Sequence, residues 1–202
     1  LLRVAPARAL HRHLDARIAL LELVEGGAHL RRLGIVEAEG DGLRGSGESV
    51  WEIKRRFGIV SNELHLAYPA RTRASDVVAS GFFDTLGLYD TCGPWQARLA
   101  REWLAVLGLS ARAGERFDAL SFGEQRMVLV ARAMVKSPPI LILDEPCSGL
   151  DETNRRRVLA LIDRIGRETR TQMLYVSHEA GEMPACITRR LEFLPGADGR
   201  YR

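Results

Sequence analysis

The sequence predicts an α/β fold: a mostly parallel sheet flanked by helices, with a small helical subdomain. Residues 140–143 (ILIL) are all apolar, as in a strand buried on both faces of a parallel sheet. Residues 171–176 (TQMLYV) are a second stretch that predicts a buried strand. Around these runs, apolar residues recur at the three- and four-residue spacing of amphipathic helices. Short buried strands that alternate with helices favour parallel pairing.

Size and composition predict one domain, or one domain with a small appendage. The chain has 202 residues, 46% of them hydrophobic, which is enough to bury a sizeable core. No stretch approaches the roughly 18 to 20 apolar residues that cross a bilayer, and we find no secretory signal. The three cysteines lack metal-ligand spacing and are expected to be reduced thiols of a cytoplasmic protein. With a net charge of +3, no nucleic-acid partner is expected.

Residues 1–44 are an atypical N-terminal segment, and we place the main domain over residues 45–202. Residues 7–24 have apolar side chains at helical spacing. Residues 40–47 are rich in glycine, but the phosphate-binding pattern G-x-x-x-x-G-K-[ST] needs a lysine that reaches the phosphates. Lys54 and Lys136 are the only lysines, and neither stands in such a pattern.

Helices are predicted in the middle of the chain. Ser75 is a candidate cap for a helix over residues 76–79. Pro94 begins, and Gly108 ends, a helix with one apolar face. The helical subdomain starts at about residue 82; its clearest part reaches 110, and it extends to about 135. An aromatic cluster near its start is expected to be core or a docking face: Phe82, Phe83, Leu86, Leu88 and Tyr89.

A helix with a capping box follows. Ser121 is a natural N-cap, and Glu124 stands three residues later, as the capping box requires. Pro138 and Pro139 come after its apolar side and end it. Such a helix start presents backbone N–H groups and a positive dipole to an anion. Taken alone, the pattern also fits an ordinary capped helix.

Polar side chains follow the three predicted strands. Residues 58–60 are a short strand followed by Ser61 and Asn62. Asp144 and Glu145 end the strand over residues 140–143, at the end where open α/β sheets bind ligands. An Asp there can hold Mg²⁺, and a neighbouring Glu can polarise an attacking water. His178 follows the strand over residues 171–176, where it can sense a phosphate.

The remaining predicted elements close the fold. Asp151 can begin a helix over residues 155–166, with Arg155, Arg156 and Arg157 on its solvated face. Closing strands are expected at residues 187–194 and 199–201.

Four of these stretches resemble the motifs of ABC-type ATPases. In chain order, LSFGE, ILILDEP, SGLD and the strand-end SH resemble the signature motif, Walker B, D-loop and H-loop of that family. The resemblance covers residues 50–202 and implies a P-loop-NTPase-like fold. Further stretches, such as GSGESVWEIKRRFGIVSNELHL, resemble the second half of tandem ATP-binding proteins associated with molybdate transport.

The resemblance implies two cofactors, ATP and Mg²⁺, and a role for each site residue. Asp144 would position Mg²⁺, Glu145 would be the general base and His178 would contact the γ-phosphate. The partners implied are a second nucleotide-binding domain and a membrane permease, with the chain at the cytoplasmic face of the membrane. The residues implied in nucleotide binding or in communication across the domain interface are Ser121, Gly123, Glu124, Asn62 and Asp151.

The sequence departs from the family at three points. Phe122 replaces a usual glycine of the signature motif, and Asn62 stands where many members carry a glutamine. Asn62 can still offer an oxygen to Mg²⁺ but is shorter. The third departure is the missing Walker A loop: residues 15–19 (DARIA) precede Leu20-Leu21 where family members carry Gly-Lys-Ser/Thr. We therefore predict weak or absent ATP binding by the isolated chain.

Two explanations of the missing loop stay open. The domain can be degenerate and lend its signature face to an intact partner. Alternatively, residues 1–44 are not native family sequence, because of truncation or a frame error; codons for residues 4–10 (VAPARAL) can be chosen to encode Gly-Ala-Gly-Lys-Ser-Thr one frame away. The leading function is an ATP-binding subunit of an ABC transporter, with molybdate as the candidate substrate. The alternatives are a non-transport ABC ATPase in regulation or DNA repair, and an inactive scaffold half.

Overall fold

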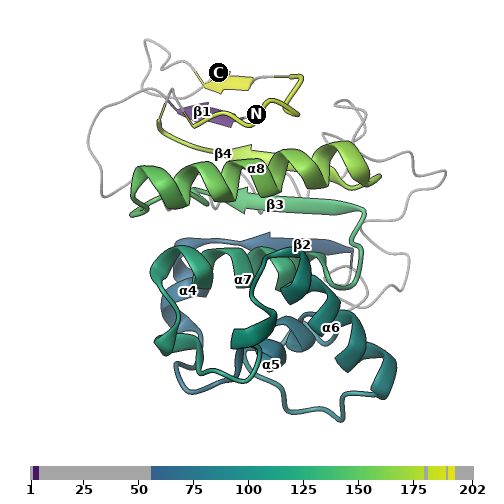
Figure 1. The fold of residues 1–202 in the computed structure, drawn as a ribbon. Coiled ribbons are helices and arrows are strands. Elements are labelled where there is room, and N and C mark those ends of the chain that lie inside the picture. The colour runs from purple at the N-terminus through teal and green to yellow at the C-terminus, as the bar shows by residue number, and fades with distance from the viewer. Residues whose placement is uncertain (1, 5–55, 180–181, 190, 194–202) are drawn as a thin grey trace, which may run out of the picture. The chain divides into compact units, whose positions relative to one another are not determined.

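The structure, shown in Figure 1, is a computed structural model that describes residues 2–4, 56–179, 182–189 and 191–193. The chain divides into two compact units, residues 1–4 with 54–202 and residues 5–53. The second unit lies outside the described residues, and with it the predicted helix at 7–24, the Gly-rich stretch and residues 15–19, where we predict that the Walker A loop is missing. The predicted strand at 199–201 also lies outside them. The domain boundary at residue 44 stays a prediction.

A five-stranded sheet in the order β2-β3-β4-β1-β5 forms the centre of the first unit, and every described pairing in it is parallel. This confirms the predicted α/β class with a parallel sheet. All four residues that precede Asp144 in β3 are buried, as predicted for a strand covered on both faces. The strands are β1 (Leu2–Val4), β2 (Phe57–Val60), β3 (Ile140–Asp144), β4 (Gln172–Val176) and β5 (Leu191–Phe193).

Two strands differ from the sequence prediction. β1 was not predicted, because three residues are too few to show a periodicity. β5 begins at Leu191, so the predicted strand over residues 187–194 started too early. The backbone near the start of the predicted strand makes hydrogen bonds outside the sheet. The Cys186 N–H donates to Asp163 Oδ1 at 2.8 Å, and the Ile187 N–H donates to the Pro184 oxygen at 3.2 Å.

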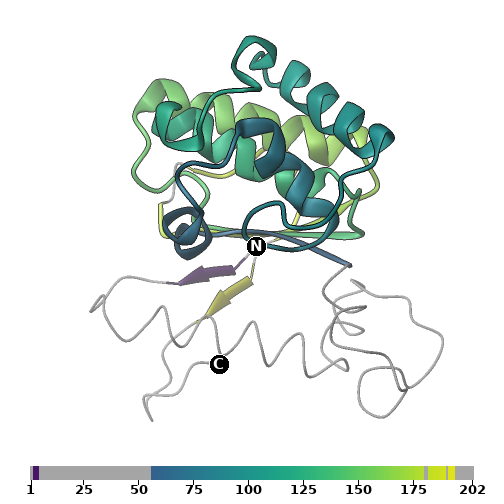
Figure 2. The ribbon, with the colours of Figure 1, turned by 90° about the horizontal axis from the view of Figure 1, so that it is seen from below.

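Helices cover the sheet, and Figure 2 shows α6, α7 and α8 on one side of β2, β3 and β4. α7 packs on β2 and lies between α5 and α8, so it holds the middle of the core. Ten of its thirteen residues are buried. The helices are α4 (Asn62–Ala67), α5 (Ala74–Ala79), α6 (Pro94–Val106), α7 (Phe122–Met134) and α8 (Glu152–Glu168). Three-residue 3-10 turns stand at Ser80–Phe82, Ser110–Arg112 and Phe117–Ala119.

Most helix boundaries follow the predicted signals. Pro94 occupies the first turn of α6, and Gly108 follows its end with φ of 72°. Ser75 is not the cap of α5, which begins at Ala74. The Ala74 and Ser75 N–H groups donate to the backbone oxygens of Glu115 and Ala113, both at 2.9 Å. Backbone oxygens of a neighbouring segment therefore accept from the N–H groups at the helix start, which a capping side chain would otherwise do.

The aromatic cluster is divided between the core and the surface. Phe82 packs against the core and meets Trp95 edge-on, with ring centroids 5.1 Å apart. Tyr89 is 79% exposed. In the described ranges, no helix has both the length and the apolar character that crossing a bilayer requires.

Gly81 marks the tightest approach between the first helices and α7. A Cβ at this position would lie 2.0 Å from the Arg132 backbone oxygen and 2.8 Å from Val135 Cγ1. Gly81→Ala should therefore force the 3-10 turn Ser80–Phe82 away from α7 and lower the free energy of unfolding by about 1–3 kcal/mol. Urea denaturation measures this change. Gly114→Ala is the control, because a Cβ there meets nothing within 4 Å; an equal loss in both variants would refute the close-packing explanation.

Candidate functional site

The carboxyl ends of β2, β3 and β4 meet at one edge of the sheet. Val60 is in register with Leu143, and Asp144 is in register with Val176. Because the strands are parallel, the polar residues that follow them arrive at the same edge. The structure therefore brings together Asn62, Asp144, Glu145 and His178, which the sequence predicted separately.

Glu145 and His178 contact each other at this edge. Nε2 of His178 lies 2.6 Å from Oε1 of Glu145, and the Glu145 side chain is 15% exposed against 45% for His178. Glu145 has a φ of 46°, in the left-handed region that non-glycine residues seldom adopt. Its N–H donates to the Val176 oxygen at 2.9 Å, which ties the strained turn to β4. Strain of this kind, about 1–3 kcal/mol, persists mainly at functional sites.

Asp144 is half-buried at the last position of β3. Within the described ranges, no three potential His, Cys, Asp or Glu ligands gather into a metal cluster. Mg²⁺ does not need such a cluster, because proteins usually hold it by one or two carboxylates together with substrate phosphates. A single carboxylate at a strand end fits that partial kind of site.

Asn62 lies at the edge, but its amide oxygen is occupied. Oδ1 of Asn62 accepts a hydrogen bond from the guanidinium of Arg126, a side chain with no exposed surface. The same guanidinium donates to the backbone oxygens of Ser61 at 3.4 Å and Ser148 at 3.5 Å. Burial lowers the pKa of Arg126, and the carboxylate of Glu145 acts against that shift. A cation already at Oδ1 disfavours Mg²⁺ at the same atom.

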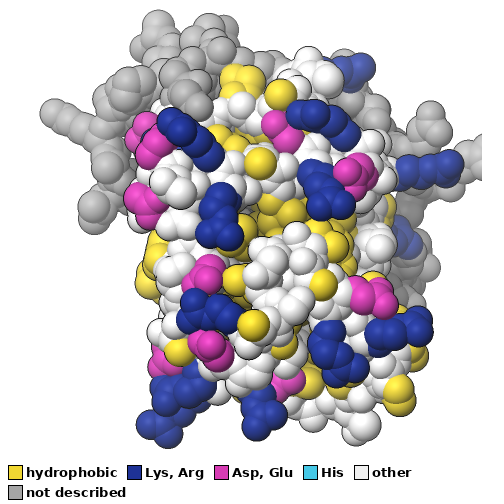
Figure 3. Space-filling view, viewed as in Figure 1, with side chains coloured by type: hydrophobic (Ala, Val, Ile, Leu, Met, Phe, Trp, Pro, Cys, Tyr) yellow, Lys and Arg dark blue, Asp and Glu magenta, His cyan; other side chains and the backbone are white. Residues whose placement is uncertain are grey.

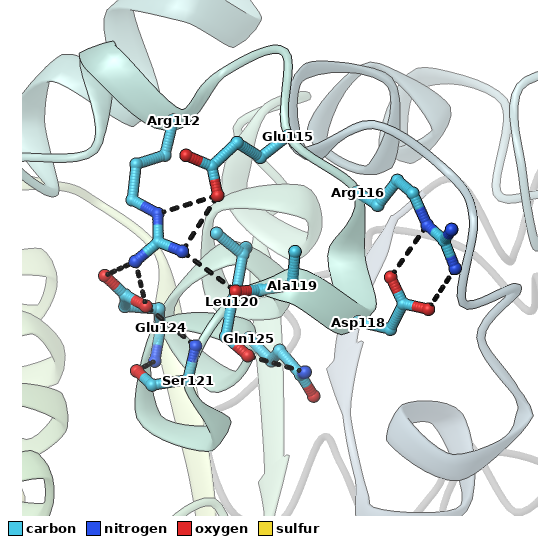
Figure 4. A network of polar contacts seen from close by, with 9 residues as sticks. All are labelled: Arg112, Glu115, Arg116, Asp118, Ala119, Leu120, Ser121, Glu124 and Gln125. Atoms are coloured by element: carbon cyan, nitrogen blue, oxygen red, sulfur yellow. Dashed lines mark hydrogen bonds and ion pairs between the residues drawn. The ribbon is translucent and has the colours of Figure 1, made fainter.

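The turn at Ser121 forms the predicted capping box, shown in Figure 4. The Ser121 hydroxyl accepts from the Glu124 N–H at 3.3 Å, and Oε2 of Glu124 accepts from the Ser121 N–H at 2.8 Å. Burial on its own would raise the pKa of Glu124, but the bonds from Ser121 and the charge of Arg112 hold it below its usual value. The turn is therefore fixed by reciprocal hydrogen bonds.

Gly123 connects this turn to the start of α8. It is buried, and a Cβ on it would lie 2.3 Å from Cγ of Asn154. Asn154 is held in turn by Asp151, which accepts from the Asn154 N–H at 2.9 Å and from Nδ2 at 2.6 Å. Asp151 is thus the N-cap of α8, although this helix begins at Glu152 rather than at residue 155. Only glycine allows this approach between the two helix starts.

Phe122 has contacts that a glycine could not make. Its ring stacks on His65 with centroids 4.4 Å apart, and the Arg126 guanidinium lies 5.6 Å from its centroid. Nε2 of His65 lies 2.6 Å from Oε1 of Gln125. Burial lowers the pKa of His65, which favours the neutral ring in this stack. The unusual signature residue therefore packs over α4, the short helix that follows β2.

Sequence reasoning missed several residues of this region. Arg126 stands among buried apolar residues of α7, and its place in that run is a signal of a buried charge. Arg112 gave no signal, because arginine is common throughout this chain. Arg155 was placed on the solvated face of α8, which is wrong: its Nε lies 2.9 Å from Oε1 of Glu182, a side chain that is 5% exposed.

The geometry can be compared with known proteins. A family model described as ABC transporter matches residues 19–148. The chain belongs to the ABC transporter family. It is 47% identical over 160 residues to the ABC transporter ATP-binding protein ModF of Escherichia coli, covering 79% of this chain and 32% of ModF. It is 32% identical over 154 residues to the molybdenum import ATP-binding protein ModC of Mesorhizobium japonicum, covering 74% of this chain and 39% of ModC.

The likeness extends to solved ABC transporter folds. A bacterial ABC transporter cassette solved as a dimer superposes with a TM-score of 0.64 at 18% identity, covering 95% of this chain and 79% of that one. This likeness supports the P-loop-NTPase-like fold. The chain spans about a third of the length of ModF and about two fifths of ModC.

The cap at Asp151 predicts a pH-dependent contribution to stability. Hydrogen bonds from Asn154 hold the pKa of Asp151 below its usual value. Its contribution is therefore complete above the unfolded carboxyl pKa and is lost as the pH falls through the lower folded pKa. Asp151→Ala should lower the urea midpoint at pH 7, and the difference from wild type should shrink towards pH 3.

Thr153→Ala is the control, because this exposed residue lies in the same first turn. Equal effects of the two substitutions, or a difference that does not change with pH, would contradict the capping role of the Asp151 carboxylate.

Proposed function

We propose that the chain is a nucleotide-binding domain of an ABC transporter that shares its ATP sites with a second such domain. The observation that carries the proposal is the preformed turn at Ser121. The capping box fixes its hydroxyl, and the first two N–H groups of α7, at Phe122 and Gly123, have no acceptor within the helix. A capped helix start of this kind suits an anionic phosphate group.

The edge formed by Asp144, Glu145 and His178 supports a hydrolytic role. Glu145 would accept a proton from the attacking water, and the contact with His178 orients its carboxylate. His178, which is the more exposed of the two, would reach the γ-phosphate. Asp144 would hold Mg²⁺, whose charge offsets that of the phosphate oxygens when it is bound. Asn62 would contribute by fixing the start of α4 through its bond with Arg126 rather than as a metal ligand.

The substrate proposal rests on the relatives. ModC carries molybdenum import in its name, and ModF shares nearly half of the aligned residues with this chain. We infer that the assembled protein takes part in molybdate transport. Its partners would be a second nucleotide-binding domain and a membrane permease, which place the chain at the cytoplasmic face of the membrane.

One observation favours a second candidate, an inactive half that only lends its signature turn. Lys136, one of two lysines in the chain, pairs with Asp84 and is 10% exposed. It comes four residues before β3 begins, whereas Asp144 ends that strand. A five-residue strand is roughly 16 Å long, so this lysine is at the wrong edge for a phosphate. Lys54 lies outside the described residues.

The isolated chain should bind MgATP weakly, because the phosphate loop supplies most backbone contacts to the nucleotide in such ATPases. Isothermal titration with MgATP should show no saturation at micromolar concentration. A micromolar dissociation constant would contradict the prediction and would indicate that other groups replace the missing lysine.

Glu145→Gln separates the two candidates. If Glu145 is the general base, this substitution should lower the ATPase rate of the assembled protein at least 100-fold, since a neutral amide cannot take the proton. Glu179→Gln is the control, an exposed carboxylate next to His178. An unchanged rate in Glu145→Gln would show that this half is catalytically silent and would favour the second candidate.

A further inference from the structure

The Arg112 side chain donates five hydrogen bonds next to the Ser121 turn. It comes from the 3-10 turn Ser110–Arg112, outside α7. Its Nη1 donates to both oxygens of Glu124, at 3.1 and 3.0 Å. Its Nε and Nη2 donate to Oε2 of Glu115 at 3.1 and 2.8 Å, and Nη2 also donates to the Ala119 oxygen at 2.8 Å. All three nitrogens of the guanidinium are therefore engaged (Figure 4).

The contact with Arg112 offsets the negative charge that Glu124 brings into the turn. Glu124 is needed in the capping box, where its carboxylate accepts from the Ser121 N–H. The Glu124 side chain is only 13% exposed, and it stands in the first turn of α7, the helix start that is proposed to meet a triphosphate. Like charges repel strongly when partly shielded from water. An uncompensated Glu124 would therefore oppose the anion that the turn is proposed to bind.

We propose that Arg112 is a positioning residue that neutralises Glu124 and thereby keeps the Ser121 turn receptive to the phosphates of a nucleotide held by a second domain. The inference rests on the proposed function of that turn. Arg112 also anchors the Ala119 oxygen, and Gln125 Nε2 donates to the Leu120 oxygen at 3.0 Å, so the segment that enters the turn is held from both sides.

A pair of substitutions separates charge compensation from simple anchoring. Arg112→Ala removes both the charge and the anchor, whereas Glu124→Gln removes only the charge that needs compensation. Glutamine still completes a capping box, so the turn is retained. If Arg112 acts by neutralising Glu124, the double variant should recover what Arg112→Ala loses. If Arg112 acts only as an anchor, the double variant should stay as impaired as the single one.

The experiment measures the apparent KM for MgATP and the kcat of the assembled protein at two salt concentrations. Arg112→Ala should raise the apparent KM about tenfold, and added salt should reduce the defect because it screens the repulsion. Glu124→Gln is the reference for the double variant, whose apparent KM should lie within about threefold of that of Glu124→Gln. Arg112→Lys, which keeps a charge near Glu124, should stay close to wild type and guards against an Arg112→Ala variant that does not fold.

The matched control is Arg116→Ala. Arg116 is an exposed arginine of the same segment that pairs with Asp118, away from the Ser121 turn (Figure 4). It should leave both kinetic constants within about twofold of wild type. A defect in Arg112→Ala that Glu124→Gln does not relieve, or an Arg112→Ala variant with unchanged KM, overturns the inference.

Ser121→Arg tests the underlying proposal separately, because it blocks the turn itself. If Ser121→Arg leaves ATP hydrolysis unchanged, the proposed role of the turn is wrong, and the inference about Arg112 falls with it. If Ser121→Arg abolishes hydrolysis while the Arg112 pair shows no rescue, only the inference about Arg112 is wrong.

Discussion

Parallel pairing of β2, β3 and β4 is the constraint on which the rest of the structure depends. Parallel strands end at one edge, and here the register brings Asp144 beside Val176. A one-residue slip in either pairing would turn a strand's buried side chains to the opposite face. The first four residues of β3 are buried, so such a slip would also disrupt side chains that are already packed on both faces of the strand. The chemical groups of the edge are therefore positioned by the packing of residues that carry no chemistry themselves.

Helix α7 positions the second part of the candidate site, the Ser121 turn. Its buried face packs on β2 and against α5 and α8, while its first turn carries Ser121 and Gly123. Arg126 brings a buried charge into the same helix and directs it to Asn62 and the Ser148 oxygen. A buried charge is tolerated only when it is paired or hydrogen-bonded, so these bonds fix the start of α4 and the loop after β3 relative to α7. The two halves of the candidate site thus share one rigid support.

The surface carries charges of both signs in close alternation. Figure 3 shows Lys and Arg side chains interspersed with Asp and Glu on the face that includes α8. Helix α8 itself has three ion pairs between residues four apart: Arg156 with Glu152, Arg164 with Glu168 and Arg167 with Asp163. Exposed pairs of this spacing contribute only about 0.3–0.5 kcal/mol each. The stability of the fold therefore depends on the core around α7 and β3 rather than on these ion pairs.

The sequence predicted the parts of this molecule that depend on local patterns. The apolar run of β3, the proline at the start of α6 and the capping box at Ser121 each follow from a few adjacent residues. Features that depend on tertiary contacts escaped prediction. Ser75 has the right side chain for a cap, yet backbone oxygens of residues 113 and 115 replace it. Arg112 and Glu124 are twelve residues apart, and no local pattern indicates that they meet.

The central claim is that the Ser121 turn serves a nucleotide held by another domain. A structure of the assembled protein with MgATP, trapped by Glu145→Gln, tests it most directly. The account predicts the Ser121 hydroxyl within about 3 Å of a γ-phosphate oxygen of a nucleotide bound to the second domain. A solvent-exposed Ser121 in a complex whose ATP sites are filled would contradict it.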